Sequence, residues 1–126
     1  MSRTIIQTSK APEAVGAYSQ AVSANGFVFC SGQVALSADG GELVGDSVAE
    51  QTARCLDNLG AVLEAAGSSL VHVVKVVAYL TDMGDFSEFN EAYEGYFASD
   101  PPARVTVGVV ALPKGARVEI ECTALV

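Results

Sequence analysis

The spacing of hydrophobic and polar positions changes several times along the chain, and each change predicts an element. Apolar residues recur at three- and four-residue steps between positions 47 and 66, which predicts an amphipathic helix. Ser47 and Glu50 form the S-x-x-E pattern of a capping box at its start. Gly67 directly after the periodic stretch is a typical helix stop. This is the clearest helix in the sequence.

A second helix is predicted over residues 86–97, "FSEFNEAYEGYF", with Asp85 and Glu88 as candidate caps. Its aromatic residues recur at helical spacing and form a stripe on one face: Phe86, Phe89, Tyr93, Tyr96 and Phe97. Such a stripe is typical of packing against a hydrophobic core.

Segments rich in β-branched residues predict the strands. A short strand opens the chain, and two more flank Asn25-Gly26, a dipeptide typical of two-residue hairpins. "LVHVVKVVAYLTD" predicts a central strand. Two last strands, "RVTVGVVAL" and "ARVEIECTALV", are expected to form a hairpin with its turn at residues 113–115. The order β-β-β-α-β-α-β-β favours an α+β fold with two helices on one face of a mixed sheet, in one domain over residues 1–126.

Arg104 stands at the head of the otherwise apolar strand "RVTVGVV". Strand alternation places Thr106 on its face and the valines on the other, and we expect the valine face to meet the helices. Glu119 and Glu121 alternate in the same way with apolar residues of the last strand, so Arg104 is expected near one of them. The spacing does not distinguish an ordinary salt bridge from a site that uses these charges.

Composition narrows the possible partners. The chain has 15 acidic and 7 basic residues, with no basic cluster, so a nucleic-acid phosphate backbone is not an expected partner. Half of the residues are hydrophobic and 17% are charged, a surplus of apolar surface that a dry monomer or an oligomer can absorb. We favour an oligomer with an apolar interface.

The sequence lacks the residues that several kinds of catalytic or metal site require. His72 is the single histidine and is expected to be structural within the central strand, so neither a catalytic triad nor a metal site is predicted. The three cysteines are widely spaced, which is typical of reduced thiols in a cytoplasmic protein. No stretch reaches transmembrane length, and the first residues lack an apolar leader segment.

Four segments, "GAYSQAV", "FCSGQVAL", "NLGAVLEAAGSSLVHVVKVVAYLTDMGDFSEFNEAY" and "PPARVTVGVVALPKGARVEIECTAL", resemble the RidA/YjgF family (reactive intermediate deaminase A) in order and spacing. The resemblance implies a chorismate-mutase-like fold and a homotrimer, in which the sheets form a central barrel and the active sites lie between subunits. It also implies hydrolysis of 2-imino acids and their enamine tautomers (2-aminoacrylate, 2-iminopropanoate, 2-iminobutanoate) to 2-oxo acids and ammonia. Neither a metal nor an organic cofactor is implied.

The same resemblance assigns site residues. Arg104 matches the arginine that binds the substrate carboxylate, and Glu119 matches the residue that positions the attacking water. Five other positions match residues that line the substrate pocket: Tyr18, Ser31, Gly32, Asn90 and Thr106. Thr106 stands where several members carry cysteine, and Ala17 replaces a common proline; neither departure removes a group that imine hydrolysis needs.

Two alternative functions stay open at this point. Some relatives are proposed to be non-catalytic small-ligand binders or stress-related holdases that use the same clefts. Ribonuclease activity or inhibition of translation is also attached to the family, and the net charge of −8 counts against both.

Overall fold

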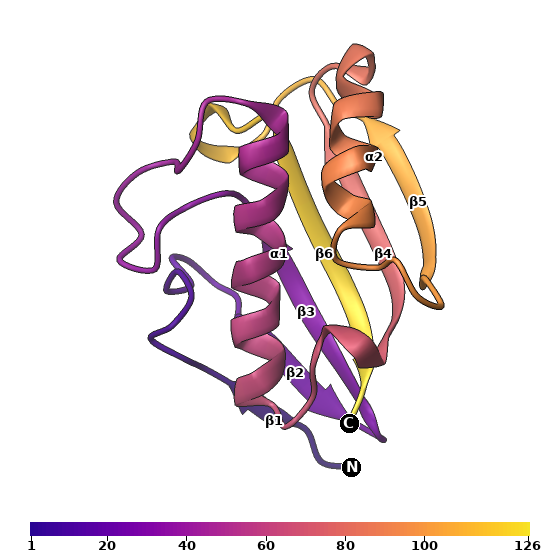
Figure 1. Ribbon diagram of the computed structural model, residues 1–126. Coiled ribbons are helices and arrows are strands. Elements are labelled where there is room, and N and C mark those ends of the chain that lie inside the picture. Colours follow the sequence, from indigo (N-terminus) through magenta and orange to yellow (C-terminus); the bar gives the residue numbers. More distant parts are fainter.

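The computed structural model describes residues 1–126 and contains one six-stranded mixed sheet with two helices on one of its faces (Figure 1). The strands are β1 (Thr4–Ile6), β2 (Ala21–Ala24), β3 (Phe27–Gln33), β4 (Val73–Leu80), β5 (Ala103–Gly108) and β6 (Val118–Leu125). The helices are α1 (Val48–Ala65) and α2 (Phe86–Glu94), with short 3₁₀ turns at Leu70–His72, Met83–Asp85 and Pro113–Gly115. The predicted element order and the α+β class are confirmed.

Local signals placed most of these elements correctly. Asn25 and Gly26 both have positive φ, 51° and 81°, as a two-residue hairpin turn between β2 and β3 requires. The Ser47 side chain accepts a hydrogen bond from the Glu50 amide at 3.0 Å, and the Glu50 carboxylate accepts one from the Ser47 amide at 3.2 Å. The predicted capping box of α1 is therefore confirmed.

Asp85 is the N-cap residue of α2, as predicted, but neither predicted side chain makes a cap hydrogen bond. The Asp85 carboxylate makes no cap hydrogen bond and instead pairs with Arg117 at 3.0 Å. Glu88 accepts a hydrogen bond from the Ala49 amide, so it joins α2 to the first turn of α1. Tertiary partners thus take both carboxylates, and α2 ends at Glu94 rather than at residue 97.

The predicted hairpin between the last two strands is also wrong. The sheet order is β1-β2-β3-β6-β4-β5, so β4 lies between β5 and β6 (Figure 1). β6 alternates buried and half-buried residues and occupies a central place, with antiparallel partners on both sides. β5 pairs in parallel with β4 and forms the edge of the sheet.

His72 differs from its expected place in a strand. It ends the 3₁₀ turn before β4, is exposed, and its Nδ1 lies 3.0 Å from the Ser69 hydroxyl.

The core fills the space between the sheet and the two helices. Its largest fully buried side chains include Leu56, Leu59 and Leu63 of α1, Phe89 of α2, and Ile120 of β6. No helix is both long enough and apolar enough to span a bilayer. The opposite face of the sheet carries no helix and exposes apolar side chains: Ile5, Phe27, Phe29, Val105, Val107 and Leu125.

Candidate active site

Arg104 projects from β5 toward α2, where three aromatic rings surround its guanidinium group. The guanidinium carbon lies 4.7 Å from the ring centre of Tyr93, 5.6 Å from that of Phe89 and 5.7 Å from that of Phe86. One guanidinium nitrogen donates a hydrogen bond to the Asn90 side-chain oxygen at 2.8 Å. The single ion pair of the chain joins Arg117 and Asp85, so no carboxylate neutralises Arg104. These four α2 side chains, Phe86, Phe89, Asn90 and Tyr93, are called the Arg104 cage below.

Arg104 reaches a surface hollow of about 510 Å³ between the end of α2 and the start of β5. Asn90, Tyr93 and Glu94 line its polar side, and Phe97 and the Pro101-Pro102 pair line its apolar side. A guanidinium group has five N–H donors in a planar fork, and Asn90 accepts from one nitrogen. The hollow therefore offers an unpaired cation with free donors, which suits a small carboxylate.

Thr106 lies two residues beyond Arg104 and on the same face of β5. It is half-buried at the level of Ala78, and its hydroxyl is buried without a hydrogen-bond partner. The Tyr93 hydroxyl is the other buried side-chain polar atom that lacks a partner. Both unpartnered hydroxyls belong to residues around Arg104.

Glu119 lies elsewhere, on the helix-free face of the sheet. β3 bulges between Cys30 and Gln33, and the Glu119 carboxylate lies against Gly32 in this bulge. Burial, and then the negative charge of Glu121, raise the pKa of the Glu119 carboxyl above its ordinary value. The Tyr79 hydroxyl donates a hydrogen bond to Glu121 at 2.8 Å.

A hollow of about 380 Å³ brings together Tyr18, Gly32 and Glu119, with Pro113 and Lys114 on its rim. Ser31 fixes the neighbouring loop, because its hydroxyl donates to the Ser19 carbonyl at 2.6 Å and its amide donates to the Gln20 carbonyl at 3.0 Å.

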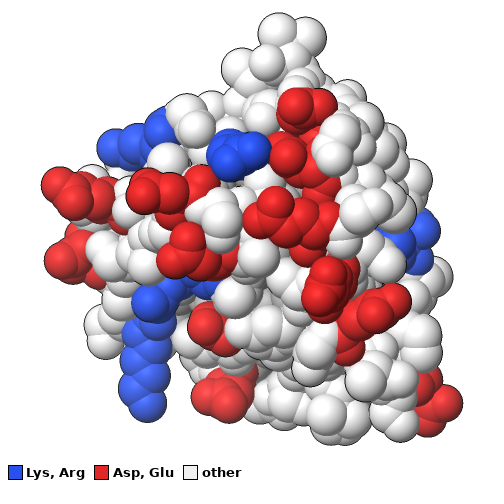
Figure 2. Space-filling view, turned by 45° about the horizontal axis from the view of Figure 1, so that its top comes forward, with Lys and Arg blue, Asp and Glu red and all other residues white.

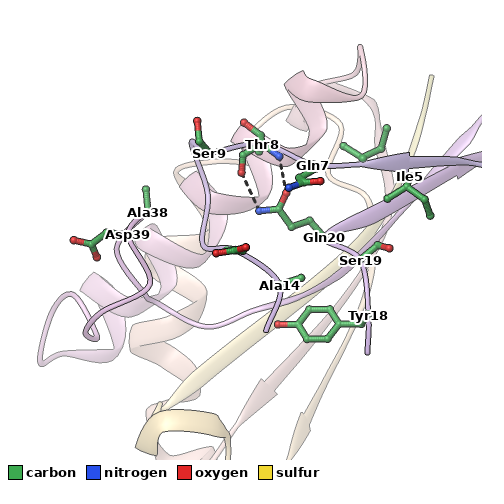
Figure 3. Close-up of a pocket in the computed structure, with 12 residues that line it drawn as sticks. Ile5, Gln7, Thr8, Ser9, Ala14, Tyr18, Ser19, Gln20, Ala38 and Asp39 are labelled. Atoms are coloured by element: carbon green, nitrogen blue, oxygen red, sulfur yellow. Dashed lines mark hydrogen bonds between the residues drawn. The ribbon is translucent and has the colours of Figure 1, made fainter. Parts of the chain in front are cut away.

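The Gln20 side chain holds the first loop in place next to Tyr18 (Figure 3). Its amide nitrogen donates to the carbonyl oxygens of Thr8 and Pro12, at 3.1 and 2.7 Å, while its oxygen accepts from the Thr8 amide at 2.7 Å. Tyr18 lies beside a further hollow of about 520 Å³ that this loop lines. The loop and the strand bulge therefore set the position of the Tyr18 side chain.

The seven candidate residues thus form two groups on opposite faces of the sheet. In the strand register, Arg104 is level with Val76 and Cys122 on the helix face, whereas Glu119 is level with Tyr79 and Val107 on the open face. Arg104, Asn90 and Thr106 make the first group; Tyr18, Ser31, Gly32 and Glu119 make the second. The expectation that Arg104 lies near Glu119 or Glu121 is wrong within one chain, as is the expectation that the β5 valines face the helices. Register with β4 sets this outcome, because it turns Val105 and Val107 outward.

Comparison with known proteins covers nearly the whole chain. The family model described as endoribonuclease L-PSP matches residues 8–126. A rat protein named 2-iminobutanoate/2-iminopropanoate deaminase is 47% identical over 123 residues, which cover 98% of this chain and 90% of the relative. The chain belongs to the RidA/YjgF family.

Solved structures of the RidA/YjgF family have the same fold. The crystal structure of RidA from an Antarctic Psychrobacter superposes with a TM-score of 0.93, at 43% identity, and the match covers 98% of this chain and 99% of that one. The structure of Escherichia coli TdcF with bound serine gives a TM-score of 0.92 at 37% identity and covers 98% of both chains.

Sequence reasoning missed the cage around Arg104. The aromatic residues of α2 were expected to pack in the core, and Phe89 and Tyr93 are indeed buried. The same rings also face a guanidinium group, which their spacing alone does not reveal. One signal was present in the sequence: a lone arginine on an apolar strand needs a partner, and the aromatic face of the neighbouring helix is one that can supply it.

Gly32 offers a direct test of the Glu119 position in this RidA/YjgF chain. A Cβ added at Gly32 would overlap the Glu119 carboxylate, so we expect Gly32→Ala to displace that group without unfolding the chain. Displacement of about 1 Å at a reacting group lowers turnover about 100-fold. Turnover of imino acids and thermal unfolding are the measurements.

Gly60→Ala in α1 is the matched control. The added Cβ would lie 3.6 and 3.7 Å from two carbon atoms of Leu70, which are ordinary contact distances. This variant is expected to keep full turnover. Full turnover in Gly32→Ala would show that the Glu119 position does not matter.

Proposed function

We propose that this chain is a 2-iminobutanoate/2-iminopropanoate deaminase that hydrolyses 2-imino acids to 2-oxo acids and ammonia. The observation that carries the proposal is Arg104, a half-buried cation that no carboxylate neutralises and that lies beside a hollow with ample room for a small carboxylate. Relatives of 46–47% identity bear the name of this activity. The serine bound to the TdcF relative has the carboxylate and amine positions of such substrates.

The working enzyme in this proposal is a homotrimer with its active sites between copies. Arg104 and Glu119 lie on opposite faces of one sheet, so a cleft that uses both takes them from different chains. The helix-free face supports association, because it exposes Phe29 by 50%, Val105 by 43% and Val107 by 38%. Covering this face would remove apolar surface from water and further desolvate Glu119.

Each group then has a role in one balanced reaction. Arg104 binds the substrate carboxylate through its planar fork, and Glu119 holds a water molecule at the imine carbon and accepts its proton. The water oxygen bonds to carbon as the second bond of C=N opens, which gives a carbinolamine. The carbon–oxygen double bond then forms as the carbon–nitrogen bond breaks, and the nitrogen leaves as ammonia with both protons of the water. Tyr18, Ser31 and Gly32 line the Glu119 side of the cleft, while Asn90 and Thr106 line the Arg104 side.

The activity is tested by generating the imine in place. A pyridoxal-phosphate dehydratase acting on threonine releases 2-iminobutanoate, and 2-oxobutanoate formation is followed with and without this protein. We expect a rate above that of spontaneous hydrolysis. A rate equal to the spontaneous one would contradict the proposal.

The trimer is tested at Phe29, on the helix-free face. Phe29→Asp is expected to convert a trimer into monomers, because burying an unpaired carboxylate costs several kcal/mol. Sedimentation measures the mass, and imine hydrolysis is expected to fall with it. Val71→Asp is the control, since Val71 is 89% exposed in the 3₁₀ turn outside the sheet. A wild-type monomer with full activity would exclude the shared cleft.

Nuclease activity has less physical support. Figure 2 shows a face on which acidic side chains are widespread and the basic ones stand apart from one another. Contact with several phosphates needs a group of cations, and the net charge of −8 repels nucleic acid.

Two smaller parts complete the proposal. Residues 1–126 form a single RidA/YjgF-like domain, which the one sheet and one core cluster support. The protein is cytoplasmic, a location consistent with the three free thiols of Cys30, Cys55 and Cys122.

A further inference from the structure

We propose that Tyr93, together with Phe86 and Phe89, is a positioning residue that holds the Arg104 guanidinium group ready for a carboxylate. The inference rests on the proposed function and assigns a role to α2 residues that would otherwise count as core. The geometry comes from the spacing of α2. Positions 86, 89 and 93 follow one face of the helix, and β5 presents Arg104 to that face.

The rings form a row of tilted neighbours that restrict one another's orientation. Phe86 and Phe89 have ring centres 6.3 Å apart, Phe89 and Tyr93 are 5.6 Å apart, and Tyr93 and Phe97 are 4.8 Å apart. Phe89 is fully buried and Tyr93 is 4% exposed, so neither ring can turn away without disturbing the core. The closest ring to the guanidinium carbon is that of Tyr93, at 4.7 Å.

Ring faces stabilise a cation without using up its hydrogen-bond donors. A carboxylate in their place would accept two donors of the guanidinium fork and compete with a substrate for them. The aromatic faces attract the positive charge through their quadrupoles and leave the N–H groups free. Asn90 is the one side chain that accepts from Arg104, so most of the fork stays available.

Within Tyr93 it is the ring, not the hydroxyl, that acts. The hydroxyl is buried without a hydrogen-bond partner, so it does not tether Arg104. Burial raises the pKa of Tyr93 above its ordinary value, and the Arg104 charge, 4.7 Å from the ring centre, offsets part of this rise. A phenylalanine at position 93 therefore keeps the cation–π interaction, whereas a leucine, which is apolar but has no ring, removes it.

Affinity for the product 2-oxobutanoate gives the first readout. Loss of one partly desolvated cation–π contact is expected to increase the dissociation constant about tenfold in Tyr93→Leu. In Tyr93→Phe, which keeps the ring, the dissociation constant should change less than about twofold. In turnover, Tyr93→Leu raises KM more than it lowers kcat. Tyr96→Leu is the matched control: it is the same substitution in the turn just after α2, at a side chain that bonds to Asp57 and Ala53 rather than to Arg104. Tyr96→Leu keeps the wild-type affinity.

The second readout observes Arg104 directly and needs no substrate. In nitrogen-15 NMR spectra, a guanidinium group held by its surroundings shows separate Nη signals at low temperature, and a free one shows an averaged signal. The Arg104→Lys variant assigns the signal by its absence. We expect separate signals in the wild type and in Tyr93→Phe, and an averaged signal in Tyr93→Leu.

The two readouts separate this inference from the proposed function. An averaged Arg104 signal in the wild-type protein would overturn the inference, and so would wild-type affinity in Tyr93→Leu, even in an active deaminase. Separate signals lost in Tyr93→Leu and kept in Tyr93→Phe would support it, even if imine hydrolysis were absent and the proposed function failed. Equal loss of affinity in Tyr96→Leu would assign the effect to helix stability and also overturn it.

Discussion

Replacing Arg104 by lysine is expected to lower kcat/KM for 2-iminobutanoate about 100-fold or more, equivalent to about 3 kcal/mol. Lysine keeps the positive charge but lacks the planar fork that binds both carboxylate oxygens. It also loses the stacking with three aromatic rings and the donor that reaches Asn90. The dehydratase-coupled assay measures the change, and most of it should appear in KM.

Arg3→Lys is the control for charge and side-chain length, because Arg3 is exposed before β1. It should behave as wild type. Wild-type kcat/KM in Arg104→Lys, with the fold intact, would show that the fork is not what binds the substrate.

Replacing Glu119 by glutamine is expected to lower kcat about 100- to 10,000-fold, the usual range for loss of a general base. The amide has nearly the same shape, so the carboxylate-binding half of the cleft stays complete and KM should change little. Steady-state kinetics separates the two parameters. Glu64→Gln, at an exposed position of α1, is the control for charge removal.

The same carboxyl predicts a pH dependence. In the proposed mechanism its charged form accepts the proton from water, so the rate should rise with pH through the pKa of Glu119. Burial and the Glu121 charge raise this pKa, so the rise should lie at higher pH than for an ordinary glutamate. Glu121→Gln removes one raising cause and should move the rise to lower pH. A pH profile that is identical in Glu119→Gln and wild type would exclude this role.

Local signals predicted nearly all of the elements. The capping box at Ser47 and the Asn25-Gly26 turn depend on residues within three positions of each other, and both are confirmed. Asp85 takes the predicted N-cap position of α2, but the cap hydrogen bonds are absent because Arg117 and the Ala49 amide, far away in sequence, are the partners of Asp85 and Glu88. Competition of this kind cannot be seen in a short window of sequence.

The site shows a similar limit. Alternation correctly placed Arg104 and Thr106 on one face of β5, and the resemblance supplied the residue set. Which face meets the helices depended on the parallel register of β5 with β4, where Arg104 is level with Val76. Two valines on the other face favoured the wrong choice, because apolar side chains usually face the core, whereas the edge strand β5 exposes Val105 and Val107.

The edge position of β5 has a consequence for the chain in the cell. A newly made copy presents an unpaired strand edge and a bare apolar sheet face, both of which invite aggregation. In the proposed assembly, the association that covers this apolar surface also forms the complete active site. A chain that fails to find its partners would then be both inert and a substrate for chaperones or proteases, so quality control of folding would also be quality control of activity.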